Sequence, residues 1–264
     1  MVLNRRFDIK VKEAKKVLWE EMRRTEFAQA VKAQAIVIIP VGSVEQHGSH
    51  LPLNTDANIP FEIARRSALA IDDFSVLVTP PIWTGFSPHH MQHPGTITLK
   101  CQTLIDVLTQ VAQSIHAHGL RKIFFLNGHV GNDVAITACS RKLGPEDGVS
   151  TAVGYGYWEM PGLHEIAEVV CETDKCYIGH SGELETSMEL YLQPELIDMS
   201  AEFYVRGTSG DPSKATADKG ERIINAAVTG LISKLRDFHS GKLEDEMVWR
   251  KEVPEKENWS WKMM

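Results

Sequence analysis

Acidic and imidazole side chains gather in VGSVEQHGSHLPLNTD, residues 41–56, directly after an apolar run that ends at Pro40. Glu45 and His47 are two residues apart, so on an extended segment their side chains point to the same side. Asp56 adds two carboxylate oxygens, which could bridge two ions. Carboxylate and imidazole ligands suit Zn, Mn or Fe(II). The segment is therefore either a polar surface loop with a capping Asp or part of a metal site.

Three further segments also place histidines in polar loops beside predicted strands or helices. They span residues 82–96, 127–133 and 178–187. Seven of the eleven histidines fall in the four segments, namely His47, His50, His89, His90, His93, His129 and His180. Each segment also contains Gly or Pro, which allows the backbone to turn tightly. A random scatter of surface histidines would not favour four loops in this way, so the pattern predicts one shared site.

The elements that must position these loops alternate between strand-like and helix-like segments. Buried strands are predicted at residues 35–42, 74–81, 122–129 and 150–158. Helices are predicted at residues 10–33, 58–71 with Asn58 as a possible N-cap, 103–119, 133–143, 182–192 and 216–241. This alternation predicts one α/β domain over residues 1–241, with a mostly parallel sheet covered by helices on both faces, and a peripheral tail at 242–264. In such folds the ligand-binding and catalytic residues lie at the carboxyl ends of the strands.

Composition narrows the class of protein. The net charge of −7 argues against nucleic acid and against an anionic membrane as partners. No segment reaches the roughly 18 consecutive apolar residues of a membrane span, and the N-terminus lacks the apolar segment of a signal peptide. The four cysteines form no CxxC pair, so a cytoplasmic enzyme with reduced thiols is expected. No Gly-rich nucleotide motif follows any predicted strand, which argues against a nucleotide-binding oxidoreductase.

Four motifs, GSVEQHGSHLPLNTD, HHMQHPGT, FFLNGHVGN and HSGELETS, occur in an order and spacing that resemble the creatininase (creatinine amidohydrolase) family. The resemblance covers roughly residues 10–240. It implies a three-layer αβα sandwich that binds two divalent metal ions, Zn or Mn and sometimes Fe. It also implies a homo-oligomer, often a hexamer, that acts on a small-molecule substrate.

The resemblance also implies roles for individual residues. Glu45 and His129 would hold one metal ion, His47 would hold the other, and Asp56 would bridge the two. His180 matches the histidine that donates or accepts a proton beside the metals. The expected activity is hydrolysis of a small cyclic substrate or non-peptide amide, in which the metals activate a water that attacks a carbonyl.

One expected ligand of the second metal is missing. Creatininase has a glutamate two residues after the histidine that corresponds to His129, and this chain has Gly131 there. Glu185 is the predicted replacement and Glu183 is the alternative, because both lie near the start of a helix whose dipole favours a carboxylate. We expect Leu184 and Met188 to face the core, which turns Glu185 toward the site and Glu183 toward solvent.

The predicted substrate contacts are His90, Trp158 and Ser87. Trp158 matches one tryptophan of the creatinine pocket, but Cys176 replaces another, so creatinine is not the expected substrate. The chain resembles instead the branches that deformylate an amide or open a cyclic inosose ketone, as 3-dehydro-scyllo-inosose hydrolase does. A ring-ketone substrate remains the first alternative. An inactive protein with a single metal is the second, because Gly131 removes a ligand.

Overall fold

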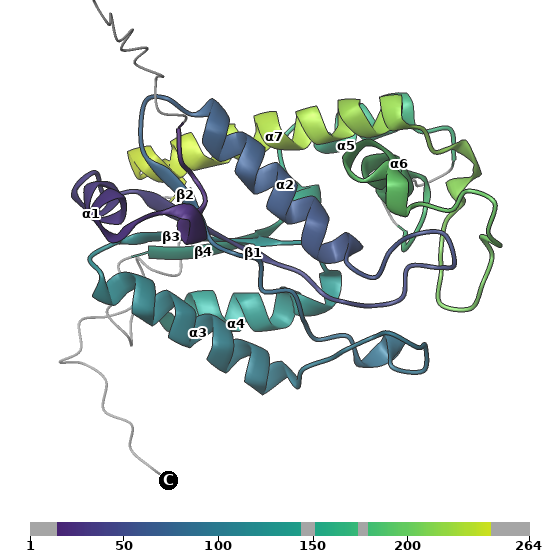
Figure 1. Ribbon diagram of the computed structural model, residues 1–264, viewed down its shortest axis with the longest axis horizontal. Coiled ribbons are helices and arrows are strands. Elements are labelled where there is room, and N and C mark those ends of the chain that lie inside the picture. The colour runs from purple at the N-terminus through teal and green to yellow at the C-terminus, as the bar shows by residue number, and fades with distance from the viewer. Residues whose placement is uncertain (1–14, 144–150, 174–178, 244–264) are drawn as a thin grey trace, which may run out of the picture.

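Four parallel strands form the central sheet of the computed structural model, which describes residues 15–143, 151–173 and 179–243 (Figure 1). Their spatial order is β2-β1-β3-β4. The bounds are Ile36–Val41 for β1, Val76–Val78 for β2, Lys122–Asn127 for β3 and Thr151–Gly156 for β4. The tail and Cys176, for which the sequence makes predictions, lie outside the described residues apart from Lys242 and Leu243.

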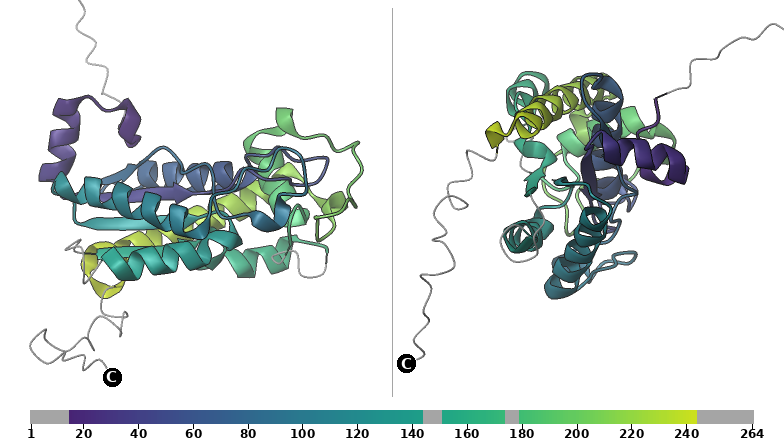
Figure 2. Two further views of the ribbon diagram at one scale, coloured as in Figure 1. Left: turned by 90° about the horizontal axis from the view of Figure 1, so that it is seen from below. Right: turned by 90° about the vertical axis from the view of Figure 1, so that its left-hand side faces the viewer.

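Helices cover both faces of this sheet (Figures 1 and 2). One face carries α2 (Thr55–Ala70), α5 (Leu163–Val170), α6 (Glu183–Leu192) and α7 (Ala217–Ser240). The other carries α3 (Cys101–Ala117) and α4 (Asp133–Leu143), and α1 (Arg24–Lys32) joins its core. The predicted three-layer αβα arrangement is confirmed. No helix within the described ranges is both long and apolar enough to cross a membrane.

The continuous apolar run of β1 follows from burial on both faces. Ile36 and Ile38 belong to the core under α2 and α7, whereas Val37 and Ile39 belong to the core over α3 and α4. All four side chains are fully buried. A strand covered on both sides needs apolar residues at every position, which explains why this segment lacks polar–apolar alternation.

The strand order places two of the polar loops next to each other. The chain moves from β1 to β2 on one side and then crosses to β3 on the other, so the order reverses at β1. Val41 is paired with Asn127 at the carboxyl ends of β1 and β3. The loop of Glu45 and the loop of His129 therefore leave the sheet side by side, at the position where open α/β sheets bind ligands.

The prediction of a helix over residues 10–33 is wrong for much of its described part. Only α1, Arg24–Lys32, is α-helical there. Leu18 forms a parallel bridge with Val78, and Trp19–Glu21 forms a single 3-10 turn. Pairing with β2 outweighs the local helical periodicity, because it satisfies backbone groups and buries Val17 in the core.

Three smaller expectations also need correction. Asn58 is not an N-cap, because α2 begins at Thr55, and its amide instead donates to the carboxylate of Glu189. The short helix α5 is absent from the sequence prediction. Cys171 is disulfide-bonded, although Cys101 and Cys139 are free, so the expectation of uniformly reduced thiols is wrong at Cys171. A disulfide needs only a suitable Cα separation, which folding can supply without a CxxC motif.

The contact between α6 and α7 depends on Gly220. A Cβ atom at this position would lie 1.8 Å from the carbonyl oxygen of Ser187 in α6. Gly→Ala normally stabilises a helix interior by about 1 kcal/mol. We expect Gly220→Ala to lower the free energy of unfolding by about 1–3 kcal/mol instead, because the two helices must separate. Urea denaturation measures this, with the exposed Ser233→Ala on α7 as control; an unchanged or raised stability for Gly220→Ala would contradict the packing argument.

Candidate active site

A cavity of about 860 Å³ lies where the polar loops meet, at the carboxyl ends of β1 and β3. In Figure 1 the carboxyl ends of these strands point toward the right-hand end of the molecule. The side chains that line it come from all four predicted segments and include Glu45, Asp56, His89, His90, His129, His180 and Glu185. Tyr157, Trp158 and Leu163 add an aromatic and apolar wall. The structure thus brings together segments that are more than 100 residues apart in the chain.

The first group of possible metal ligands centres on His129. Its Nδ1 lies 3.3 Å from Oε2 of Glu45 and 3.1 Å from Oδ2 of Asp56. Neither of these oxygens has an aligned hydrogen-bond partner among the described residues. Tetrahedral Zn with bonds of about 2.0–2.2 Å sets its ligand atoms about 3.3–3.6 Å apart. The two distances from Nδ1 of His129 are therefore close to those between ligand atoms that share one ion.

A second group lies on the other side of Asp56. Oδ1 of Asp56 is 3.0 Å from Nε2 of His47, while Oδ2 faces His129. Ligand atoms of His47, His180 and Glu185 also lie within 4.8 Å of one another. One carboxylate thus faces two histidines with its two oxygens, which is the geometry needed to bridge two ions.

Both of these histidines are held by backbone carbonyls. Nε2 of His129 lies 3.2 Å from the carbonyl oxygen of Phe86, and Nδ1 of His47 lies 3.2 Å from that of Glu45. A carbonyl oxygen only accepts, so each of these ring nitrogens carries the proton and donates it. In the neutral rings, Nδ1 of His129 and Nε2 of His47 are then left with lone pairs that face Asp56. Metal-binding histidines are typically fixed by a hydrogen bond of this kind, so the residues present fit a metal.

The negative charge of the site is also compatible with bound metal ions. Glu45 is fully buried and Asp56 is 3% exposed, yet no lysine or arginine is among the described residues that line the cavity. Burial alone would lower the pKa of His47 and His129, but the neighbouring carboxylates, Asp56 and Glu45 for both and Glu185 for His47, together outweigh it and raise both pKa values to about 10. The carboxylates therefore require positive charge, which either protons on the histidines or metal ions can supply.

Glu185 and Glu183 lie in different environments. Glu185 lines the cavity, and its Oε2 accepts the backbone N–H of Ser181 at 2.6 Å. Glu183 is fully buried, with its carboxylate 2.7 Å from Nζ of Lys219 and 2.6 Å from Oγ1 of Thr173. The expectation that Glu183 faces solvent is wrong, because Lys219 on α7 pairs with it. Leu184 and Met188 are in the core as expected. Metal binding by Glu185 stays a prediction.

The absence of a ligand at Gly131 has a steric cause. A Cβ atom there would lie 2.3 Å from Nε2 of His129 and 2.5 Å from the carbonyl oxygen of Phe86. These are the two atoms of the hydrogen bond that orients His129. A side chain at this position would separate them, so glycine is required by the packing of the neighbouring ligand.

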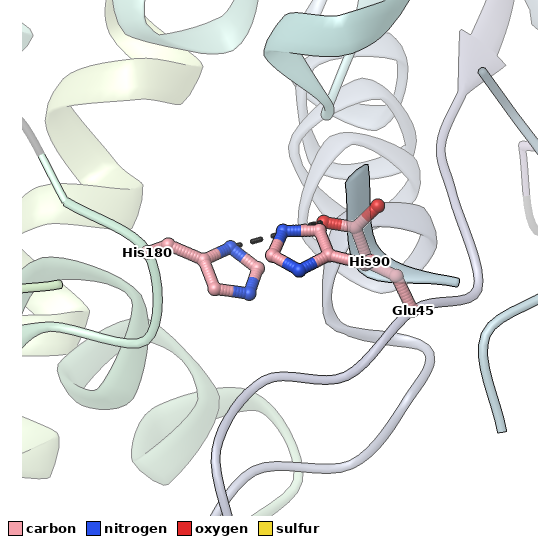
Figure 3. A group of neighbouring side chains, drawn as sticks. All are labelled: Glu45, His90 and His180. Atoms are coloured by element: carbon pink, nitrogen blue, oxygen red, sulfur yellow. Dashed lines mark ion pairs between the residues drawn. The ribbon is translucent and has the colours of Figure 1, made fainter. Parts of the chain in front are cut away.

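Two of the three predicted substrate contacts lie in the cavity wall. Trp158 and His90 line the cavity. Nε2 of His90 and Nδ1 of His180 lie 3.5 and 3.8 Å from Oε1 of Glu45, and Figure 3 shows the three side chains pointing toward one another. Ser87 is fully buried and does not line the cavity. The prediction that Ser87 contacts substrate is not supported, because its backbone is held in the loop by Thr98 and His90.

The site also contains two amide side chains and one loop that the sequence analysis does not predict. Asn132 accepts the N–H of Phe86 at 2.8 Å and donates to the carbonyl of Gly42 at 3.0 Å, so it joins the loops that follow three strands. Gln46 contacts both His90 and His180. Residues 207–209 form part of the cavity wall. The Gly-rich run RGTSGD at 206–211 is the one sequence signal that marks this loop.

Comparison with known proteins agrees with this geometry. The family model for creatininase, described as creatinine amidohydrolase, matches residues 20–235, which include every candidate ligand. This chain belongs to the creatininase family. The resemblance of the four motifs is therefore confirmed as family membership.

Proteins similar to this chain are named for different substrates. The mycofactocin precursor peptide peptidase of Mycolicibacterium smegmatis is 32% identical over 213 residues, covering 76% of this chain and 84% of that one. The 3-dehydro-scyllo-inosose hydrolase of Thermotoga maritima is 30% identical over 184 residues, covering 69% of this chain and 58% of that one. Solved creatininase structures, one with Mn and one variant of the Zn–Zn type, give TM-scores of 0.71 and 0.69. Each is 27% identical, covering 84% of this chain and 98% of the other.

Substitution of Asp56 tests the bridging geometry. We expect Asp56→Ala to lose both bound metal ions, because His47 and His129 each lose a shared partner. Glu45→Ala should lose mainly the ion beside His129. Elemental analysis after dialysis against Zn or Mn measures the ratio of metal to protein, with the exposed Asp218→Ala as a charge-matched control. Full metal content in the Asp56 variant would rule out bridging.

Gly131→Glu tests the steric explanation of the missing ligand. Although it introduces the glutamate that the resemblance predicts at this position, we expect it to reduce metal content, because the new side chain displaces His129. The measurement is isothermal titration of the metal-free protein with Zn. Tighter binding in the variant would show that the loop can accommodate a side chain, and the crowding argument would fail.

Proposed function

We propose that the protein is a metal-dependent hydrolase that cleaves an amide C–N bond of a substrate bound in the cavity. The observation that carries this proposal is the buried carboxylate of Asp56, which faces one histidine with each oxygen. Divalent ions held there would polarise a carbonyl group and activate a water at neutral pH. Family membership supports hydrolysis over a purely structural use of the metal.

We further propose that the chain binds two ions. Glu45, His129 and Asp56 would hold one, and His47, Asp56 and Glu185 would hold the other. The Zn–Zn type of creatininase and its Mn form support Zn or Mn. Burial raises the pKa of Glu185 to about 7 in the metal-free protein. A cation beside this carboxylate would favour its ionised form.

His180 would carry the proton of the reaction. It lies on a loop opposite Glu45 and its ring is packed at 4.2 Å from that of His47. Burial lowers the pKa of His180 to about 3, so its imidazole is neutral at physiological pH in the metal-free protein. With so low a pKa, His180 would accept a proton only from a water that bound metal ions have made more acidic, and it would readily return that proton to the leaving nitrogen.

The size and lining of the cavity favour a substrate larger than a simple formamide. A volume of about 860 Å³ is within the range of pockets that enclose drug-sized ligands. Trp158, Tyr157 and Leu163 offer an apolar wall beside the polar centre. The peptidase relative supports extending the class from the non-peptide amides expected from the motifs to amides within short peptides.

Ring opening of an inosose ketone is a second candidate. It is supported by the relative from Thermotoga maritima, which the chain matches over 184 residues. The two candidates differ in the bond that breaks, since amide hydrolysis produces a new amino group, on a separate or the same molecule, and cleavage of a ring ketone produces none. A panel of cyclic amides, formamides, short peptides and inososes, followed by mass spectrometry of the products, separates them.

Glu185 and Glu183 form a matched pair for testing the second ion. We expect Glu185→Gln to lower the occupancy of one metal and to reduce kcat about 100-fold or more. Glu183→Gln should retain both metals and most activity while lowering Tm, because Lys219 loses the buried one of its two carboxylate partners and keeps only the more exposed Glu172. Metal analysis, steady-state kinetics and calorimetry on both variants provide the comparison. The reverse ranking would move the ligand to Glu183, and no effect on metal from either would favour a single ion.

A further inference from the structure

The side-chain amide of Gln46 has an orientation that its backbone partners determine. Its Oε1 lies 3.0 Å from the backbone N of Gly48, and its Nε2 lies 2.7 Å from the carbonyl oxygen of Gly207. A backbone N–H can only donate and a carbonyl oxygen can only accept. The reversed amide would place oxygen against oxygen and N–H against N–H, so it is excluded. Nε2 therefore donates one hydrogen to Gly207 and has one more available.

The second hydrogen of Gln46 Nε2 points to His90. The distance from Nε2 to Nδ1 of His90 is 2.9 Å. If Nδ1 carried a proton, two donors would face each other across this distance. Nδ1 must therefore accept, and the proton of the neutral ring is on Nε2. That nitrogen faces the cavity, 3.5 Å from Oε1 of Glu45.

The main chain of Gln46 acts in the same way on His180. Nε2 of His180 lies 2.6 Å from the carbonyl oxygen of Gln46, so it carries the proton and donates. Nδ1 is then without a proton and lies 3.8 Å from Oε1 of Glu45. The 3.1 Å separation between Nε2 of His180 and Nε2 of Gln46 is a contact between two donors whose hydrogens point elsewhere.

We propose that Gln46 is a positioning residue that sets the tautomers of both histidines. His90 presents a donor to the cavity and His180 presents an acceptor, on either side of the same carboxylate oxygen (Figure 3). Ligand atoms of Glu45, His90 and His180 are close enough to suggest a further metal group. Because Gln46 uses the lone pair of His90 Nδ1, neutral His90 has no lone pair left on Nε2 for a metal.

The reaction roles follow from these tautomers, and they rest on the proposed hydrolase function. His90 would donate a hydrogen bond from Nε2 to the substrate carbonyl oxygen. Water would form a bond to the carbonyl carbon as Nδ1 of His180 takes its proton. The same proton would then pass to the leaving nitrogen as the C–N bond breaks. The products are a carboxylic acid and an amine, and His180 returns to its starting state.

The tautomers are measurable without any substrate. The full chain, loaded with Zn and labelled with ¹⁵N-histidine, gives long-range ¹H–¹⁵N spectra that distinguish protonated from bare ring nitrogens. His90→Gln and His180→Gln proteins assign the signals. We expect protonated Nε2 and bare Nδ1 in both rings. A wild-type spectrum with protonated Nδ1 in either ring would overturn the proposal.

Gln46→Glu provides the decisive comparison, since a carboxylate has no hydrogen to donate. We expect the proton of His90 to move to Nδ1, while His180 keeps its tautomer because the main-chain carbonyl remains. The exposed Gln29→Glu, on α1, should change neither ring. With a substrate in hand, kcat/KM should fall about 10–100-fold in Gln46→Glu.

An unchanged His90 tautomer in folded Gln46→Glu would overturn the proposal, and if that variant does not fold the wild-type spectrum decides. Expected tautomers without turnover of any amide would reject the hydrolase function and leave the tautomer assignment standing.

Discussion

Buried negative charge is the constraint on which the site depends. Glu45 and Asp56 are 0% and 3% exposed, and no lysine or arginine among the described residues lines their cavity. Removing an ionised carboxylate from water costs several kcal/mol unless a cation compensates it. The histidines that face these acids are held by backbone carbonyls, and in their neutral form each directs a lone pair inward. The site therefore requires positive charge, which protons on these histidines or bound metal ions must supply.

The rest of the structure brings the loops to this charge. The reversal of strand order at β1 places the loops after β1 and β3 side by side. Neutral amides then join the loops, Asn132 beneath the ligands and Gln46 beneath His90 and His180. An amide offers both a donor and an acceptor and adds no charge. It can therefore orient the neighbouring side chains without changing the net charge of the candidate metal site.

The fold and the residue types of the candidate site can be predicted from local patterns in the sequence. Continuous apolar strands and helical periodicity are local signals in the sequence. A parallel sheet then brings the acids and histidines that follow its strands to one edge. The errors arise from contacts between distant residues. Glu183 is buried because Lys219 pairs with it, and residues 15–23 are not α-helical because Leu18 pairs beside β2. The crowding at Gly131 depends on the carbonyl of Phe86, which no local pattern reveals.

Anomalous diffraction from crystals grown with Zn tests the central claim most directly. The account predicts two peaks for each chain, one between His129 and Asp56 and one between His47 and Asp56, with the Asp56 carboxylate bound to both. Glu185 should complete the second site. One peak, or two peaks that do not share Asp56, would contradict the binuclear centre on which the proposed hydrolysis rests.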